Sequence, residues 1–69
     1  MTFRSLLKEK DIRGAQLARR ICVSRSLISH WVLGKAIPKE NHITQIATVL
    51  NVSVEEVIKC FEEQPQESV

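Results

Sequence analysis

Apolar residues recur every three or four positions along most of the chain, which places them on one face of an amphipathic helix. The first such segment follows Thr2, whose hydroxyl suits an N-cap, and ends near Lys10 and Asp11. A second segment covers about residues 14–21. No segment alternates apolar and polar residues as a half-buried strand does. The pattern therefore predicts an all-α fold.

Residues typical of helix ends bound the next two segments. Ser24 precedes a third helix, which ends near Leu33 and Gly34, because glycine readily takes the left-handed conformation that closes a helix. A loop at residues 35–38 then leads into a fourth helix over about residues 39–50. Both helices are short enough to belong to a small bundle.

A brief polar turn separates the last two helices. Asn51 suits the left-handed C-cap of the fourth helix, and Ser53 followed three residues later by Glu56 has the spacing of a capping box that opens a fifth. Connections this short are typical of a compact helical domain, so we expect a five-helix fold. The inward positions in this pattern are Phe3, Leu6, Leu7, Leu17, Ala18, Ile21, Ile28, Trp31, Val32, Ile43, Ile46, Ala47, Leu50, Val54, Val57, Ile58 and Phe61.

Length and composition limit how the chain is organised. Its 69 residues, 43% of them hydrophobic, suffice for one small core. We expect a domain at residues 1–61 and a polar C-terminal tail at residues 62–69. No apolar run could span a membrane and no secretory signal is visible, so we expect a cytoplasmic protein. Cys22 and Cys60 fall at apolar helical positions, and we expect both to be reduced and packed.

Charge is divided unevenly along the chain. Residues 1–39 carry nine Lys or Arg and two acidic residues, a net charge of +7. Residues 40–69 carry one Lys and six Glu, a net charge of −5. This asymmetry favours a polyanionic partner for the first half, and leaves the acidic half free to meet another protein. Chance asymmetry in a small domain is the alternative.

The second and third helices are joined by a turn too short for an antiparallel hairpin. Only Cys22 and Val23 separate Ile21 from Ser24, so the two helices must cross, and Ala18 is small enough to allow their close approach. This spacing is that of a helix-turn-helix.

Two stretches, "LARRICVSRSLISHWVLGKAIP" and "IATVLNVSVEEVI", carry a family resemblance over about residues 3–61. The chain resembles the DNA-binding domains of the lambda and 434 repressors and Cro, the XRE-type helix-turn-helix family. The resemblance implies a transcription regulator, in particular a repressor, which binds a palindromic operator as a homodimer with its third helix in the major groove. It also implies a dimer surface on the fifth helix near Phe61.

Three positions depart from the family pattern. The family usually has glycine in the turn, where this chain has Cys22, and a side chain there is strained if φ is positive. The family often opens its second helix with Ser or Thr and then Gln, whereas this chain has Arg13 and Gly14. The usual glutamine contact to a phosphate is therefore missing, and Arg13 or the Gly14 amide would replace it.

The resemblance assigns roles to the outward residues of the third helix, whose buried direction is set by Ile28 and Trp31. Leu27 lies on the flank, where it either meets a thymine methyl or packs against the protein. The expected base contacts are Arg25, Ser26, Ser29 and His30. The expected phosphate contacts are Arg13, Arg19, Arg20, Ser24, Lys35 and Lys39.

Several of these residues also fit functions other than DNA binding. Arg25 and His30 could be solvated surface residues, Ser24 is a helix cap first, and His42 is expected on the surface without a partner. Catalysis is disfavoured, because the chain has a single Asp, no glycine-rich phosphate loop and no metal-ligand spacing, and we expect no cofactor or metal. The alternative is an antitoxin or adaptor module that binds another protein through the acidic half.

Overall fold

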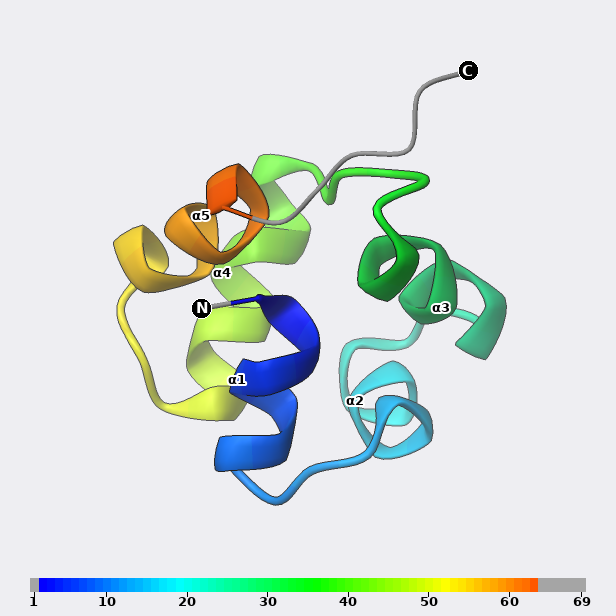
Figure 1. Ribbon diagram of the computed structural model, residues 1–69. Helices are drawn as coiled ribbons and strands as arrows, with labels where there is room; N and C mark the ends of the chain where they lie inside the picture. The colour runs from blue at the N-terminus through cyan, green and yellow to red at the C-terminus, as the bar shows by residue number, and fades with distance from the viewer. Residues whose placement is uncertain (1, 64–69) are drawn as a thin grey trace.

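The structure, a computed structural model, describes residues 2–63, which form five helices and no strand. Figure 1 shows them wrapped around a common centre. The predicted all-α, five-helix domain is therefore confirmed. The helices are α1 (Phe3–Glu9), α2 (Gly14–Ile21), α3 (Arg25–Leu33), α4 (Glu40–Leu50) and α5 (Val54–Glu63).

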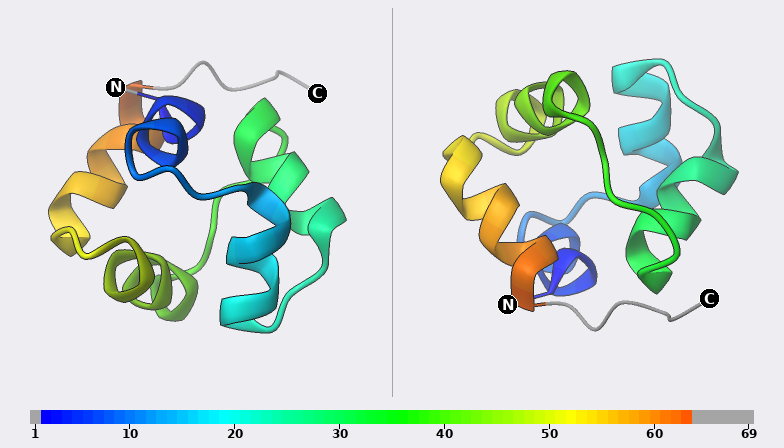
Figure 2. Two further views of the ribbon diagram at one scale, coloured as in Figure 1. Left: turned by 90° about the horizontal axis from the view of Figure 1, so that it is seen from below. Right: turned by 90° about the horizontal axis from the view of Figure 1, so that it is seen from above.

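The helices form two groups. α1, α4 and α5 lie on one side of the molecule and α2 and α3 on the other, with the connection from α3 to α4 passing between them (Figure 2). Contacts of α2 with α4, and of α1 with α3, join the two groups.

Side-chain caps fix the starts of three helices where the sequence predicts them. A hydroxyl at each position accepts a hydrogen bond from a backbone amide in the first turn, and so satisfies a donor that has no partner inside the helix. These bonds run from the Ser5 amide to Thr2 (3.2 Å), from the Leu27 amide to Ser24 (3.1 Å) and from the Glu56 amide to Ser53 (3.2 Å).

Left-handed residues end the three middle helices. Gly34 (φ 79°) closes α3 and Asn51 (φ 57°) closes α4, as predicted. Cys22 (φ 60°) closes α2 in the same conformation, so a non-glycine residue bears the strain that the sequence suggested. The prediction that Cys22 is packed is wrong, because its side chain is exposed while the next residue, Val23, packs against the core.

Aromatic rings at the centre of the core hold α1, α3 and α5 together. Phe3 packs edge-on against Trp31, with ring centroids 6.5 Å apart, and in a tilted arrangement against Phe61 at 4.9 Å. His42, expected on the surface without a partner, is instead half-buried, with its ring centroid 5.3 Å from that of Trp31. That expectation is therefore wrong, and His42 joins the start of α4 to α3.

The buried face of α5 differs from the predicted one. Val57, Cys60 and Phe61 are buried, whereas Val54 and Ile58, both predicted to point inward, are 38% and 37% exposed. Successive residues are rotated by about 100° around a helix. The buried face is therefore centred on Val57, Cys60 and Phe61, and Val54 and Ile58 lie at its edge.

α5 also continues through Glu62 and Glu63, which the sequence analysis placed in the tail. Glutamate is a good helix former, and the buried Phe61 anchors this last turn. The remainder of the expected tail, residues 64–69, lies outside the described residues.

Candidate nucleic-acid interface

α2 and α3 cross at the short turn instead of lying antiparallel (Figure 2). Ala18 and Ile21 are buried on the α2 side, and the Val23 amide donates to the Ala18 carbonyl at 2.9 Å, which ties the turn back onto α2. A Cβ added at Gly14 would lie 3.1 Å from Cγ2 of Ile28, so the start of α2 lies almost in contact with the middle of α3. Glycine at position 14, which departs from the family pattern, has no Cβ and therefore permits this close packing.

α3 has an apolar face that is buried and a polar face that is exposed. Ile28 and Trp31 are buried, at 2% and 1% exposure. Leu27 is partly buried and packs against the core, which favours the second of the two roles considered for it. The four residues predicted to contact bases are all exposed: Arg25, Ser26, Ser29 and His30. Their shared outward orientation is therefore confirmed, while their contacts with bases stay a prediction.

The predicted phosphate contacts fall into two sets. Arg13 lies directly before α2, Ser24 directly before α3, and Lys35 and Lys39 on the connection that follows α3; all four are exposed. Arg13 and Arg25 line one shared basin, so the structure brings the start of α2 beside the outward face of α3.

Arg19 and Arg20 lie elsewhere. They line a different basin with Lys10 and Gln16, next to the end of α1 and to Val49 of α4. The structure therefore separates these two arginines from the α3 face, although the sequence placed all six candidates in one set.

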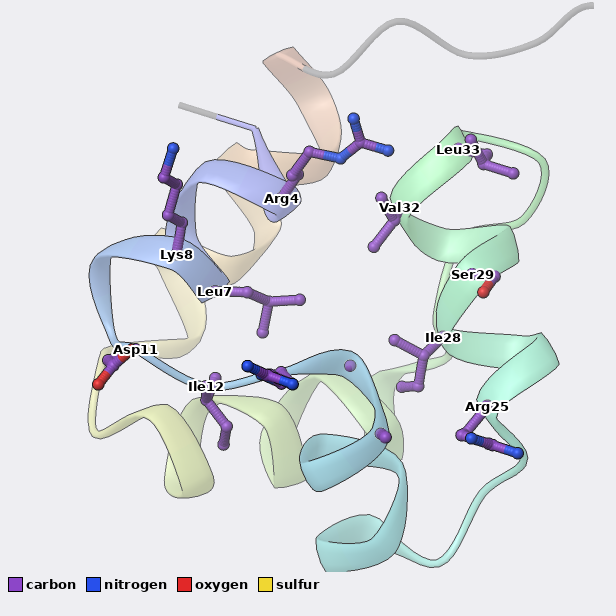
Figure 3. Close-up of a pocket in the computed structure, with 13 residues that line it drawn as sticks. Arg4, Leu7, Lys8, Asp11, Ile12, Arg25, Ile28, Ser29, Val32 and Leu33 are labelled. Carbon is purple, nitrogen blue, oxygen red and sulfur yellow. The ribbon is translucent and has the colours of Figure 1, made fainter.

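Figure 3 shows the basin between α1 and α3, which we call the α1–α3 basin. Its volume is about 750 Å³. Leu7 extends from α1 toward Ile28 and Val32 on α3. Arg4 and Lys8 on α1, which sequence reasoning did not select, also line it. Their spacing of four residues on the polar face of a helix was the available signal.

The charged residues along α2, α3 and the connection after α3 are all basic. No acidic residue occurs between Asp11 and Glu40, whereas this stretch holds six Lys or Arg residues. Within residues 2–63 no group of His, Cys, Asp and Glu side chains could hold a metal ion. The arrangement thus offers cations, hydroxyls and helix N-termini, which are the groups that bind phosphates and base edges.

Comparison with family models identifies a helix-turn-helix domain in the chain. A helix-turn-helix model, HTH_3, matches residues 3–57, which is most of the chain and includes the crossing of α2 and α3. The chain belongs to the XRE-type helix-turn-helix family. Its resemblance to the lambda and 434 repressors is thereby confirmed. Comparisons with curated proteins and with solved structures find no match.

Membership of the XRE-type family indicates a DNA-binding regulator, from a family that is typically not enzymatic. α3 is the second helix of the helix-turn-helix. In proteins of this type the second helix lies in the major groove of DNA. Among residues 2–63 there is no helix of sufficient length and apolar character to traverse a bilayer.

Proposed function

We propose that this XRE-type protein is a sequence-specific repressor that binds a palindromic operator in double-stranded DNA as a homodimer, with α3 in the major groove. The observation that carries the proposal is the polar face of α3, where four exposed side chains able to bind base edges stand over a buried Ile28 and Trp31. A surface evolved for a protein partner would more often be apolar and aromatic. Repression follows if the occupied operator overlaps a promoter.

Base readout rests mainly on Arg25. Its guanidinium is exposed at the start of α3, where side chains reach base edges, and it can donate two hydrogen bonds to the O6 and N7 atoms of guanine. Ser26, Ser29 and His30 can each donate and accept, so they adjust the preference of neighbouring positions without fixing one base alone.

Phosphate contacts come from the flanks of α3. Lys35 and Lys39 lie on the connection after it, and Ser24 lies at its start. Arg13 is the N-cap residue directly before α2 and has no acceptor side chain to cap the helix, so the free amides of the first turn and the guanidinium attract the same anion. Arg19 and Arg20 contribute to the long-range attraction of DNA, because they face a different basin.

Dimerisation is assigned to α5. Val54 and Ile58 are four residues apart on this helix, and they are two of the four large apolar side chains that are exposed within residues 2–63. A lone domain of this kind reads only a few base pairs, whereas two copies related by a twofold axis read a palindrome.

An antitoxin or adaptor role is the second candidate. Glu55, Glu56, Glu62 and Glu63 are exposed along α5 and would suit a basic protein partner. Such a partner and a second copy of the chain would compete for the same helix.

Selection from a random duplex DNA library, repeated at two salt concentrations, tests the proposal. We expect an enriched palindrome whose affinity falls as salt rises, because each neutralised phosphate releases counterions. Enrichment of a single half-site would contradict the dimer. Uniform weak binding to all sequences would contradict a sequence-specific regulator and favour the protein-binding role.

A further inference from the structure

The α1–α3 basin combines an apolar floor with a cationic rim. Its volume of about 750 Å³ falls within the range of about 300–1,000 Å³ found for small-molecule sites. Aliphatic side chains from three parts of the chain form the floor, and one of them, Leu33, is 50% exposed. The floor residues are Leu7, Ile12, Ile28, Val32 and Leu33.

Arg4 is the cation that best covers this floor. Figure 3 shows its guanidinium reaching from α1 across the opening toward Val32 and Leu33, whereas Lys8 extends away from the floor. Asp11, the one acidic residue of the lining, lies on the far side of the basin from Leu33. Arg4 is exposed, so its guanidinium is accessible to a ligand.

We propose that the α1–α3 basin binds a small amphipathic carboxylate, with its aliphatic chain on Leu7, Val32 and Leu33 and its carboxylate paired with Arg4. The chain would remove exposed aliphatic surface from water, which is the main favourable contribution to binding here. The carboxylate would receive the two parallel N–H donors of the guanidinium. A phosphodiester backbone would satisfy the cation but would leave the aliphatic floor uncovered.

Such a ligand would also regulate DNA binding. Arg25 and Ser29 line the same basin and belong to the proposed base-contacting face, so ligand and operator cannot occupy it together. This consequence rests on the proposed function, whereas occupation of the basin does not.

Chemical-shift titration of the full chain with octanoate tests the site itself, without DNA. We expect saturable shifts of the methyl groups of Leu7, Val32 and Leu33. Octanol, which lacks the carboxylate, and acetate, which lacks the chain, should each bind at least about tenfold more weakly, a factor that corresponds to 1.4 kcal/mol. Equal binding of octanol and octanoate, or no saturable shift, would overturn the proposal.

Two variants in the basin, each with a matched control outside it, distinguish binding at this site from binding elsewhere on the surface. Leu33→Ser and Arg4→Gln should each weaken octanoate binding about tenfold, because they remove floor and cation respectively. Ile37→Ser, which removes a 60% exposed side chain outside the basin, and Arg19→Gln should leave it unchanged. Equal losses in a variant and its control would refute the assigned location.

A competition assay distinguishes failure of the site from failure of the proposed function. Where the selected operator binds, octanoate should release it, and Leu33→Ser should raise the octanoate concentration needed for half-release about tenfold. Octanoate shifts without any operator binding would refute the proposed function and leave the site established. Operator release without octanoate shifts at the basin would refute the site.

Discussion

Arg25 is the residue on which sequence readout depends most. It is exposed at the first position of α3, and no acidic side chain of the described residues pairs with it. Arg25→Ala should cost about 1–3 kcal/mol of operator affinity and relax the preference at one base position. Arg25→Lys keeps the charge but loses the planar pair of donors. It should therefore lose base preference as Arg25→Ala does, but lose less non-specific affinity than Arg25→Ala. Binding of a set of single-base operator variants measures both, and an unchanged preference in Arg25→Ala would remove Arg25 from the base contacts.

Cys60 links stability to pH. Burial in the core raises the pKa of its thiol above the ordinary value of 9.0, because the thiolate is poorly solvated there. The unfolded chain therefore loses this proton at a lower pH than the folded one does. The stability that depends on the neutral thiol is complete below about pH 9 and is lost as the pH rises toward the higher folded-state pKa.

Urea unfolding between pH 7 and pH 11 measures this linkage. The free energy of unfolding should fall at the alkaline end, and the fall should be smaller in Cys60→Ala, which has no thiol at this position but retains every lysine. Cys22→Ala removes the exposed thiol and serves as the matched control for the loss of a cysteine. Identical slopes in all three proteins would contradict the assignment to Cys60.

At the scale of the element, α3 depends on its N-cap. The Ser24 hydroxyl accepts from the Leu27 amide at 3.1 Å, and the start of this helix carries the proposed base contacts. Ser24→Ala should lower the free energy of unfolding by about 1 kcal/mol. Ser29→Ala changes the same residue type at an exposed interior position of α3, where alanine is the better helix former, and should cause no loss. Chemical denaturation of both variants measures the difference, and equal stabilities would show that the cap contributes little.

Helix bounds were predictable from sequence because local chemistry sets them. Thr2, Ser24 and Ser53 cap helices through bonds to residues three positions away, and Gly34 and Asn51 end helices through their own backbone conformation. None of these features depends on distant parts of the chain, so single-sequence patterns capture them.

The predictions that failed depend on contacts between elements. Val54 and Ile58 fit an inward stripe on α5, but the position of α1 and α4 decides which side of that stripe is covered. His42 looks like a surface residue until α3 places Trp31 beside it. The α1–α3 basin likewise requires knowledge of how two helices distant in sequence pack, which is why Arg4 was missed.

For the whole molecule, the charge asymmetry should appear in the salt dependence of DNA binding. Lys35 lies on the basic side, directly after α3, whereas Lys59 lies on α5 among the glutamates. Lys35→Ala should weaken binding to all sequences alike and lower the slope of log affinity against log salt by about one unit. Lys59→Ala removes the same charge from the opposite half and should leave the slope unchanged. Equal slopes for both variants would place Lys35 away from the phosphates.

Assembly is the property of the whole molecule that decides how much sequence it can read. Ile58 is 37% exposed on α5, whereas the residues of the core are at most 6% exposed, and a second copy of α5 would cover Ile58. Ile58→Asp puts a charge into that contact and removes the burial of a side chain that is 37% exposed in the monomer, which is worth about 1–2 kcal/mol over the two copies before the cost of burying the charge. The dimer dissociation constant should therefore rise about tenfold to a hundredfold.

Sedimentation velocity over a range of concentrations measures this change, and binding to operators with one or two half-sites shows its consequence. Ile58→Asp should bind a single half-site as the parent chain does and lose the advantage of the second. Ile37→Asp introduces the same charge at a more exposed isoleucine of the connection between α3 and α4, and should sediment as the parent chain does. Because the two variants have the same net charge, a dimer lost only in Ile58→Asp assigns the interface to α5, whereas loss in both would attribute the effect to charge alone.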